Sequence, residues 1–482
     1  MLDRIVPDAI SARPLAALLA SLALAGCAVG PDYQRPAADL PQAWPAAPAG
    51  AAANASAARW WTIYGDGALN TLVDEALAKN TDLAVAAARV TEAEAQLGLQ
   101  RTNLSPTTYA DGGRGRNRTS AKSGQFQEGM PLETTSHRAQ LNVSYELDFW
   151  GKYRRATEAA KAELLATEAA RDTVRLTLVA QVVQGHYGLL AQDARVAATQ
   201  RTLERGREAL RLLTKQFEVG MISRFDLQQR SAEIDAVEAQ LPPLMRDRAT
   251  QERALAVLLG RAPREVVDAN IRRDGERANA TTLNLAAPAG LPSELLLARP
   301  DLREAEQRLV AANARIGVAR AAYFPSITLT GAIGSESAQL SDLFSGPART
   351  WNFAGNITQA LWGAGRLMRE EEIAEVRQKI AVEQYRAAVI NAFREVQDAV
   401  GAQAAARDVF VAETRRVESL RQAYALAKLR FENGIASQLD VIDNERSLVA
   451  AEHNRIEAER ALRAAIADLY RALGAGAAKA SA

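Results

Sequence analysis

The sequence predicts an α+β membrane protein, in which long α-helices form a coiled-coil barrel and four β-strands per chain cross the membrane. Three observations predict this class. The chain repeats itself once, it contains very long proline-free segments with apolar residues at helical spacing, and it has short segments of alternating apolar and polar residues. Its 482 residues are 48% hydrophobic and carry a net charge of +1, which excludes a disordered chain and argues against a nucleic-acid-binding protein.

The duplication is visible as a gap-free alignment at an offset of 214 residues. The first copy begins at Gln216 with QFEVGMISRFDLQQRSAEIDAVEAQ, and the second begins at Arg430 with RFENGIASQLDVIDNERSLVAAEHN. Such a long period indicates a duplicated half rather than a solenoid repeat. Each half therefore has the same predicted order, which is a helix, a strand-loop-strand unit, a very long helix, a glycine turn and a return helix.

The repeat predicts six parts of the chain. They are a signal peptide at 1–26, a lipid-anchored extended N-terminal segment at 27–65, a first repeat at 66–260, an irregular equatorial insert at 261–298, a second repeat at 299–474 and a C-terminal tail at 475–482.

The N-terminal segment has the pattern of an export signal. Leu15–Gly26 is a run of small and apolar residues, which is shorter than the roughly 20 residues needed to span a bilayer but suits a signal-peptide core. LAGC, ending at Cys27, resembles a bacterial lipobox, in which the peptide is cut before the cysteine and the thiol receives a lipid. An ordinary signal peptide with an incidental cysteine is the alternative. By resemblance to lipoprotein sorting rules, Ala28 in place of aspartate favours the outer membrane.

The predicted strands have one apolar and one polar face. In the clearest of them, apolar residues from Leu141 to Phe149 alternate with polar residues from Asn142 to Asp148. Two more run from Ile327 and from Trp351, and a weaker one lies near Thr107–Asp111. Each has about 10 residues, which matches a tilted transmembrane strand. The soluble alternative is a sandwich face.

The ends of these strands give two further expectations. Trp150, Trp351 and Trp362 should form an aromatic belt at the membrane interface. Gly112–Ser136 and Gly334–Thr350 should form external loops, and we expect the arginines of the first loop to be solvated rather than to face lipid phosphates.

The predicted helices are long. Lys152 to Phe217 is free of proline and could form one helix of roughly 100 Å at about 1.5 Å per residue, and Gly363 to Phe431 is similar. Apolar residues at spacings of three and four predict coiled-coil packing. Pro242-Pro243 should break or kink the first return helix. His186 lies within such an apolar pattern, so we expect it to pack in the core rather than to act in chemistry.

Four strands are too few to close a membrane barrel, since single-chain barrels start at about 8 strands. Two chains would supply a barrel filled by its own side chains, whereas a trimer would close a 12-stranded barrel with a lumen. The helices of three chains would form a second cylinder. The sequence therefore predicts a homotrimeric conduit.

Several motifs resemble the outer membrane factor (TolC-like) family, in particular its NodT/OprM-type efflux lipoprotein branch. They are CAVGPDY from Cys27, LAVLLGRAP from Leu255, LPSELLLARPD from Leu291, AANARIGVAR from Ala311 and YFP from Tyr323. The resemblance implies an outer membrane exit duct of a tripartite efflux system, which passively conducts small molecules. Its implied partners are a periplasmic adaptor (membrane fusion protein) and an inner-membrane transporter, most often of the RND class.

The resemblance also implies roles for the two glycine turns. The far periplasmic tips of the family's helical hairpins meet the adaptor, which assigns contacts to Val219, Gly220, Met221, Ser223, Asn433, Gly434, Ile435 and Ser437. The alternative to adaptor contact is that these are only structural turns, in which Ser223 and Ser437 cap the return helices. Asp440, Asp443 and Phe431 match the family's pore constriction. Asp440 and Asp443 lie on one helical face, and carboxylate rings in a trimer would favour cations. Capping is the alternative role for Asp440.

No catalytic constellation, cofactor motif or metal-ligand set is recognisable in the sequence, so we expect no enzyme activity. Two other functions remain open. One is the outer membrane channel of an ABC-driven secretion system or an MFS pump, and the other is a structural coiled-coil lipoprotein that does not conduct.

Overall fold

The computed structural model describes residues 28–37, 59–122, 127, 129–268, 270–273, 299–361 and 363–475. The predicted signal peptide, the lipidation site Cys27 and the belt residue Trp362 lie outside the described residues, as does most of the predicted insert.

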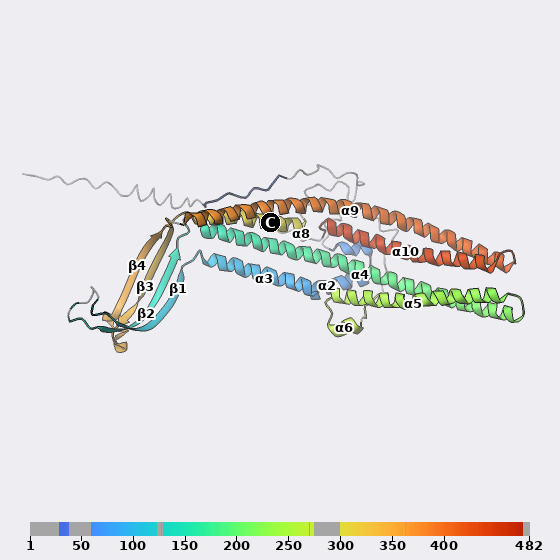
Figure 1. Ribbon diagram of the computed structural model, residues 1–482, viewed down its shortest axis with the longest axis horizontal. Coiled ribbons are helices and arrows are strands. Elements are labelled where there is room, and N and C mark those ends of the chain that lie inside the picture. The colour runs from blue at the N-terminus through green and yellow to red at the C-terminus, as the bar shows by residue number, and fades with distance from the viewer. Residues whose placement is uncertain are drawn as a thin grey trace, which may run out of the picture. The chain divides into compact units, whose positions relative to one another are not determined.

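Both halves of the chain contain the same order of elements (Figure 1). The first half has α3 (Thr81–Thr102), β1 (Thr107–Arg118), β2 (Glu133–Glu146), α4 (Lys152–Glu218) and α5 (Arg224–Leu258). The second half has α8 (Pro300–Ala321), β3 (Ser326–Ser337), β4 (Arg349–Thr358), α9 (Ala364–Glu432) and α10 (Gln438–Ala472). The long helices have 67 and 69 residues, and each return helix has 35. The predicted internal duplication and long helices are therefore confirmed.

Five of the described elements were not predicted. A 3-10 helix, η1 (Trp60–Tyr64), and α2 (Gly67–Lys79) precede α3, and the short α6 (Pro263–Asp268) follows α5. Two further 3-10 turns, Leu340–Asp342 and Gly346–Ala348, lie between β3 and β4. None of the described helices is at once long enough and apolar enough to cross a membrane.

The four strands form one antiparallel sheet in the order β1-β2-β3-β4. The expected loop at Gly112–Ser136 is wrong in part, because β1 continues to Arg118 and β2 begins at Glu133. β3 likewise extends beyond Gly334 to Ser337. The backbone ladder continues here beyond the point where apolar residues stop alternating. At the opposite end, β2 stops at Glu146, so Trp150 follows the strand rather than ending it.

Of the break or kink expected at Pro242-Pro243, the break is wrong. α5 runs from Arg224 to Leu258 through both prolines. Each proline lacks the N–H that would bond to the carbonyl four residues earlier. Both prolines are exposed, so water can reach the carbonyls that they leave unbonded, while the neighbouring Leu244 is buried and keeps the helix packed.

Among the described residues, the contacts divide the chain into two compact units, each with segments from both halves. The first, called the sheet unit, combines Met1–Ala37, Val90–Ala166 and Ala305–Tyr385. The second, called the core unit, combines Ala38–Arg89, Thr167–Glu304 and Arg386–Ala482.

In the sheet unit, the described N-terminal residues are held by ionic contacts. Arg155 pairs with Asp32 at 2.8 Å, and Arg35 binds Glu306 through two hydrogen bonds of 2.7 and 2.8 Å. The Trp150 ring stacks on Phe324 with ring centroids 4.5 Å apart. Ala28–Ala37 is free of helix and strand, which agrees with the extended segment expected after Cys27.

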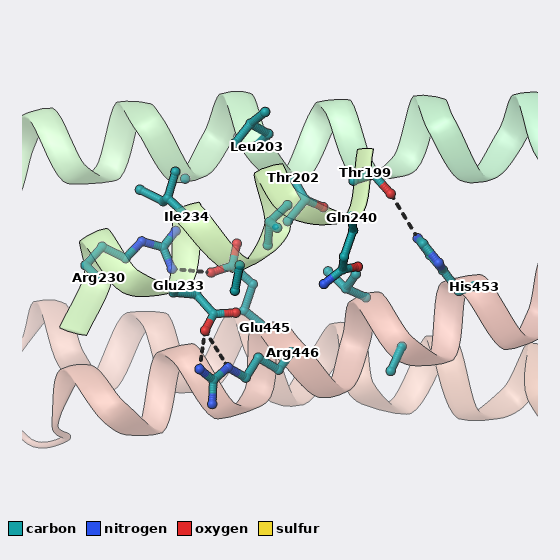
Figure 2. A pocket seen from close by; sticks show the side chains of 15 residues that line it. Thr199, Thr202, Leu203, Arg230, Glu233, Ile234, Gln240, Glu445, Arg446 and His453 are labelled. Carbon is teal, nitrogen blue, oxygen red and sulfur yellow. Dashed lines mark hydrogen bonds and ion pairs between the residues drawn. The ribbon is translucent and has the colours of Figure 1, made fainter. Parts of the chain in front are cut away.

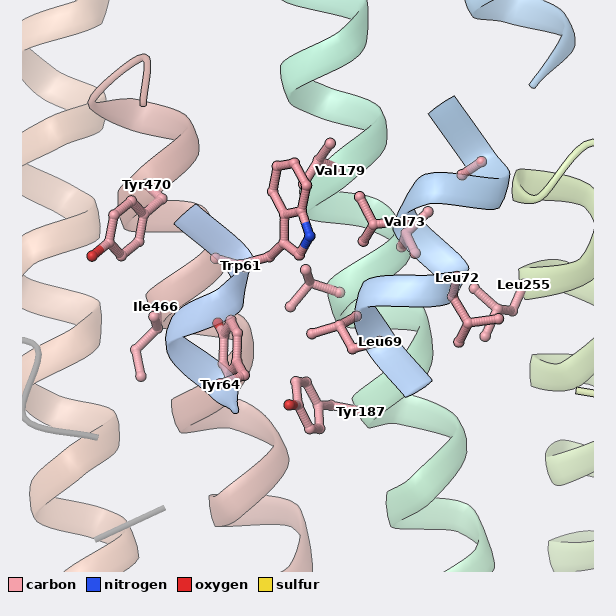
Figure 3. Packing of buried hydrophobic residues seen from close by; sticks show 14 of the residues in the cluster. Trp61, Tyr64, Leu69, Leu72, Val73, Val179, Tyr187, Leu255, Ile466 and Tyr470 are labelled. Carbon is pink, nitrogen blue, oxygen red and sulfur yellow. The ribbon is translucent and has the colours of Figure 1, made fainter. Parts of the chain in front are cut away.

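The core unit is built around the unpredicted η1 and α2 (Figure 3). Trp60 stacks on Tyr470 at 5.0 Å, and the Tyr64 hydroxyl donates to the Arg463 carbonyl at 2.7 Å. Leu69 and Val73 of α2 are fully buried in the same cluster. The packing therefore joins η1 and α2 to α4, α5 and α10.

His186 lies in this core, as expected. Its Nε2 is 3.0 Å from the Asp66 carboxylate, and both side chains are fully buried. Asp66 also caps α2, because its side chain accepts a hydrogen bond from the Leu69 N–H. A buried carboxylate is costly without hydrogen-bond partners, and here the Leu69 N–H and the His186 ring both lie within hydrogen-bond distance of it.

Candidate functional site

Each long helix ends in a glycine turn within the core unit. Gly220 has a φ of 76° and Gly434 a φ of 71°, which is the left-handed conformation that glycine adopts cheaply. Met221 N–H donates to the Gln216 carbonyl and Ile435 N–H to the Arg430 carbonyl, both at 2.8 Å. A Cβ added at either glycine would meet no atom within 4 Å. Backbone conformation, rather than space, therefore selects glycine.

The residues after each turn form a capping box. Ser223 caps α5 and Ser437 caps α10, each accepting from the N–H of an aspartate three residues later. The Asp440 carboxylate in turn accepts from the Ser437 N–H and hydroxyl, both at 2.8 Å. These two hydrogen bonds lower the pKa of Asp440. The predicted capping role is therefore confirmed for both serines.

The turns present apolar side chains to solvent. Val219, Met221 and Ile435 are 71%, 76% and 67% exposed. All eight residues assigned to adaptor contact are exposed or half-buried at the turns: Val219, Gly220, Met221, Ser223, Asn433, Gly434, Ile435 and Ser437. Phe225 and Leu439, which were not predicted, are also exposed in the first turns of the return helices. An apolar residue in the first helical turn after each capping serine could have indicated them from the sequence.

The residues assigned to the pore constriction lie at the second turn. Asp440 and Asp443 are both exposed, and Phe431 is half-buried at the end of α9. The Asp443 carboxylate lies 3.9 Å from the guanidinium of Arg446, with both side chains more than half exposed. In high dielectric such an exposed contact contributes little to stability.

Two reciprocal ion pairs connect the return helices α5 and α10 (Figure 2). Arg230 of α5 donates to Glu445 of α10 at 2.7 Å, and these side chains are only 6% and 12% exposed. Arg446 of α10 donates in the other direction to Glu233 of α5. These pairs were not predicted, although the opposite charges on both return helices indicated that such pairs could form.

A cavity of about 370 Å³ lies beside these pairs between α4, α5 and α10 (Figure 2). Its walls include Leu203 and Ile234, and the Thr199 hydroxyl lies 3.4 Å from Nε2 of His453. Burial, and then the nearby positive charge of Arg195, lowers the pKa of His453, so the imidazole is neutral at pH 7. Among the described residues, no group of three histidine, cysteine, aspartate or glutamate side chains could hold a metal ion.

The family described as outer membrane efflux protein matches residues 72–261 and 291–475. Cation efflux system protein CusC of Escherichia coli strain K12 is 35% identical over 465 residues, which are 95% of this chain and 98% of CusC. Toluene efflux pump outer membrane protein TtgC of Pseudomonas putida is 35% identical over 459 residues, which are 94% and 93% of the two chains.

Solved structures agree with these sequence relationships. The CmeC outer membrane channel of Campylobacter jejuni aligns with a TM-score of 0.84 at 26% identity, over 93% of this chain and 95% of CmeC. The CusC crystal structure, described as showing transmembrane channel formation, aligns with a TM-score of 0.81 at 33% identity, over 93% of this chain and 99% of CusC. The chain belongs to the outer membrane efflux protein family.

Proposed function

We propose that this chain is the outer membrane exit channel of a tripartite efflux system, which passively conducts small molecules to the exterior. Three copies form the channel, so that their strands close a barrel through the membrane and their helices form a conduit in the periplasm. Cys27 carries the lipid anchor after removal of residues 1–26. The chain has no catalytic activity of its own.

The observation that carries this proposal is the contrast between the two faces of the sheet. On one face, Ile333, Trp351, Phe353 and Ile357 are 62–74% exposed. The face formed by Asn142 and its cross-strand neighbours is polar instead, with Thr330 opposite Ser144 and Asn356 opposite Thr328. A contiguous exposed apolar face marks a lipid or protein contact, and a polar opposite face suits a water-filled lumen.

The apolar residues near the ends of the strands fit the same reading. Trp351 is the third residue of β4, which begins at Arg349. Trp150 lies beyond the end of β2. Tryptophan is enriched at membrane–water interfaces because its ring is apolar and its N–H is polar. We propose that these two tryptophans mark opposite interfaces of the membrane.

The hairpin turns supply the periplasmic end of the channel. We propose that the exposed apolar residues Val219, Met221 and Ile435 contact a periplasmic adaptor. That adaptor would connect the channel to an inner-membrane transporter, for which the RND class is the leading candidate. The relatives are named for efflux of cations, toluene and antibiotics, so the proposal assigns small molecules as cargo without choosing among them.

In the trimer, Asp440 and Asp443 would each form a ring of three carboxylates, and Phe431 would narrow the same opening. Such rings attract cations and oppose anions. We expect Asp440→Asn combined with Asp443→Asn to raise single-channel conductance in a planar bilayer and to weaken block by Mg²⁺.

Asp226→Asn is the matched control, because Asp226 completes the same capping box at the first hairpin but is not assigned to the constriction. Unchanged conductance and Mg²⁺ block in the double variant would contradict the constriction. An equal rise in Asp226→Asn would attribute the effect to loss of capping instead.

A further inference from the structure

The apolar face of the sheet turns basic toward the hairpin ends of the strands. Directly opposite residues of antiparallel strands point to the same face. One such row contains Ala110, Leu141, Ile333 and Trp351 across the four strands. This row belongs to the face that the proposed function assigns to lipid, so the inference rests on that assignment.

The next row on the same face, one step toward the hairpin ends, contains Gly112, Ala139, Ser335 and Arg349. Arg114 follows opposite His137, then Arg116 opposite Thr135, and Arg118 opposite Glu133. Because side chains alternate along a strand, all three arginines of β1 lie on the same face as Ala110. The face therefore changes from the ring of Trp351 to guanidinium groups within one row.

This placement differs from the solvated loop expected from the sequence. Arg114, Arg116 and Arg118 lie in β1, and the side chains of Arg116 and Arg118 are 69% and 71% exposed. Glu133 pairs with Arg116 at 2.6 Å and with Arg118 at 3.5 Å. No acidic partner of Arg114 or Arg349 lies among the residues that the structure describes, so the face keeps a positive excess.

The opposite face of the same rows is not basic in this way. Arg138 of β2 lies there, 3.7 Å from Asp111 and directly opposite Glu336 of β3. The positive excess is therefore specific to the face that carries Leu141 and Trp351. A merely solvated, charged hairpin would not need to separate its charges between the two faces.

The dimensions of this basic band limit its ligand. Arg114 to Arg118 span roughly 13 Å at about 3.3 Å per residue, and β1 and β4 lie roughly 14 Å apart at about 4.8 Å per strand. One lipid phosphate would meet only part of such a band. The planar fork of arginine suits bidentate binding of phosphate oxygens, and a position just beyond an aromatic row is the level of lipid headgroups.

We propose that Arg114, Arg116, Arg118 and Arg349 bind the phosphate groups of a bisphosphorylated glycolipid in the external leaflet of the outer membrane. Lipid A is the representative of this chemical class. The bound lipid would fix the depth of the sheet in the membrane and seal the outer rim of the channel.

The test compares binding of lipid A to the full-length, detergent-solubilised wild type and to the variant Arg114→Ser/Arg116→Ser/Arg118→Ser/Arg349→Ser. Native mass spectrometry counts the bound lipid. Each arginine near an anionic lipid surface contributes about 1 kcal/mol, or about fivefold in affinity. Arg114 and Arg349, which have no acidic partner among the described residues, should therefore account for a loss of at least about 25-fold in the variant. Arg138→Ser is the matched control, since Arg138 is an exposed arginine of the same hairpin on the other face. It should lose less than about twofold.

Three further arms decide the outcome. Dephosphorylated lipid A should bind the wild type weakly, and phosphatidylglycerol, with one phosphate, should bind more weakly than lipid A. Arg349→Ser alone leaves β1 and β2 unchanged and should lose about fivefold in affinity for lipid A. This single variant keeps the test decisive if the multiple variant fails to assemble. Equal binding of lipid A by wild type and variants, or equal binding of lipid A with and without phosphates, would overturn the proposal. Equal binding of phosphatidylglycerol would overturn the assignment to a bisphosphorylated lipid.

Conductance of the same wild-type sample separates this inference from the function on which it rests. A channel that conducts but ignores lipid phosphates would remove only the lipid site. A protein that neither conducts nor binds lipid A would remove the proposed function as well.

Discussion

The buried ion pair between the return helices makes the sharpest stability prediction. Arg230→Met keeps much of the length and the apolar stem of the side chain but removes its charge. Glu445, which is only 12% exposed, would then lose the Arg230 hydrogen bond of 2.7 Å. Breaking a buried pair by removing one partner costs about 3–5 kcal/mol in other proteins, and the slight exposure of Glu445 places this one near about 3 kcal/mol.

Hydrogen exchange measured by mass spectrometry reads this effect locally, without requiring the whole assembly to unfold in one step. A loss of about 3 kcal/mol in the opening free energy of α5 and α10 corresponds to exchange more than about 100-fold faster. The comparison uses peptides from Arg224–Leu258 and Gln438–Ala472 of the full-length protein.

Two variants control this experiment. Arg207→Met removes the exposed pair between Arg207 and Glu238, whose side chains are 56% and 54% exposed, and should cost less than about 1 kcal/mol. Arg230→Met combined with Glu445→Leu removes both buried charges and should recover most of the loss. Exchange in Arg230→Met no faster than in Arg207→Met, or no recovery in the double variant, would refute the reasoning.

Three more predictions concern the turns and the core. Gly434→Ala forces a Cβ into a φ of 71° without a clash and should cost about 1–2 kcal/mol, seen as faster exchange at the second turn but not the first. The pKa of Asp440 is lowered from its ordinary value of 3.8, so its capping of α10 is fully present above that pH and is lost as the pH falls through the folded pKa. Hydrogen exchange at the start of α10 should therefore become faster in acid in the wild type than in Asp440→Asn. The same pH dependence in both proteins would contradict this. Asp66→Ala removes the cap of α2 and leaves His186 without its carboxylate, so hydrogen exchange in Gly67–Lys79 should show a loss of about 2–3 kcal/mol in opening free energy. A loss below about 0.5 kcal/mol would show that the pair is dispensable.

The sequence was sufficient to predict the elements whose pattern repeats. Periodic patterns can be recognised in a sequence whatever its composition. They include the offset of 214 residues, the alternation through Leu141 and the apolar spacing of the long segments. The glycine turns were predictable for the same local reason, because a left-handed residue followed by a capping serine has few sequence solutions.

Features that depend on tertiary contacts could not be predicted in this way. η1 and α2 gain their stability from packing of Trp60 and Leu69 against helices far away in the sequence. The Arg230–Glu445 pair joins residues 215 positions apart. Pro242 and Pro243 were expected to break or kink a helix by local rules, but the helix continues through both, because packing on either side of them outweighs the lost hydrogen bonds. The length of β1 was missed because its outer rows carry arginine instead of apolar residues.

The central claim is that this chain forms a gated channel in the outer membrane. Single-channel recording of the purified, lipidated protein in a planar bilayer, with the oligomer mass taken from the same sample, tests it most directly. We expect a trimer that conducts weakly, prefers cations, and opens when Asp440 and Asp443 are both replaced by asparagine. A protein that does not conduct, and that stays closed in the double variant, would contradict the claim and favour a structural lipoprotein.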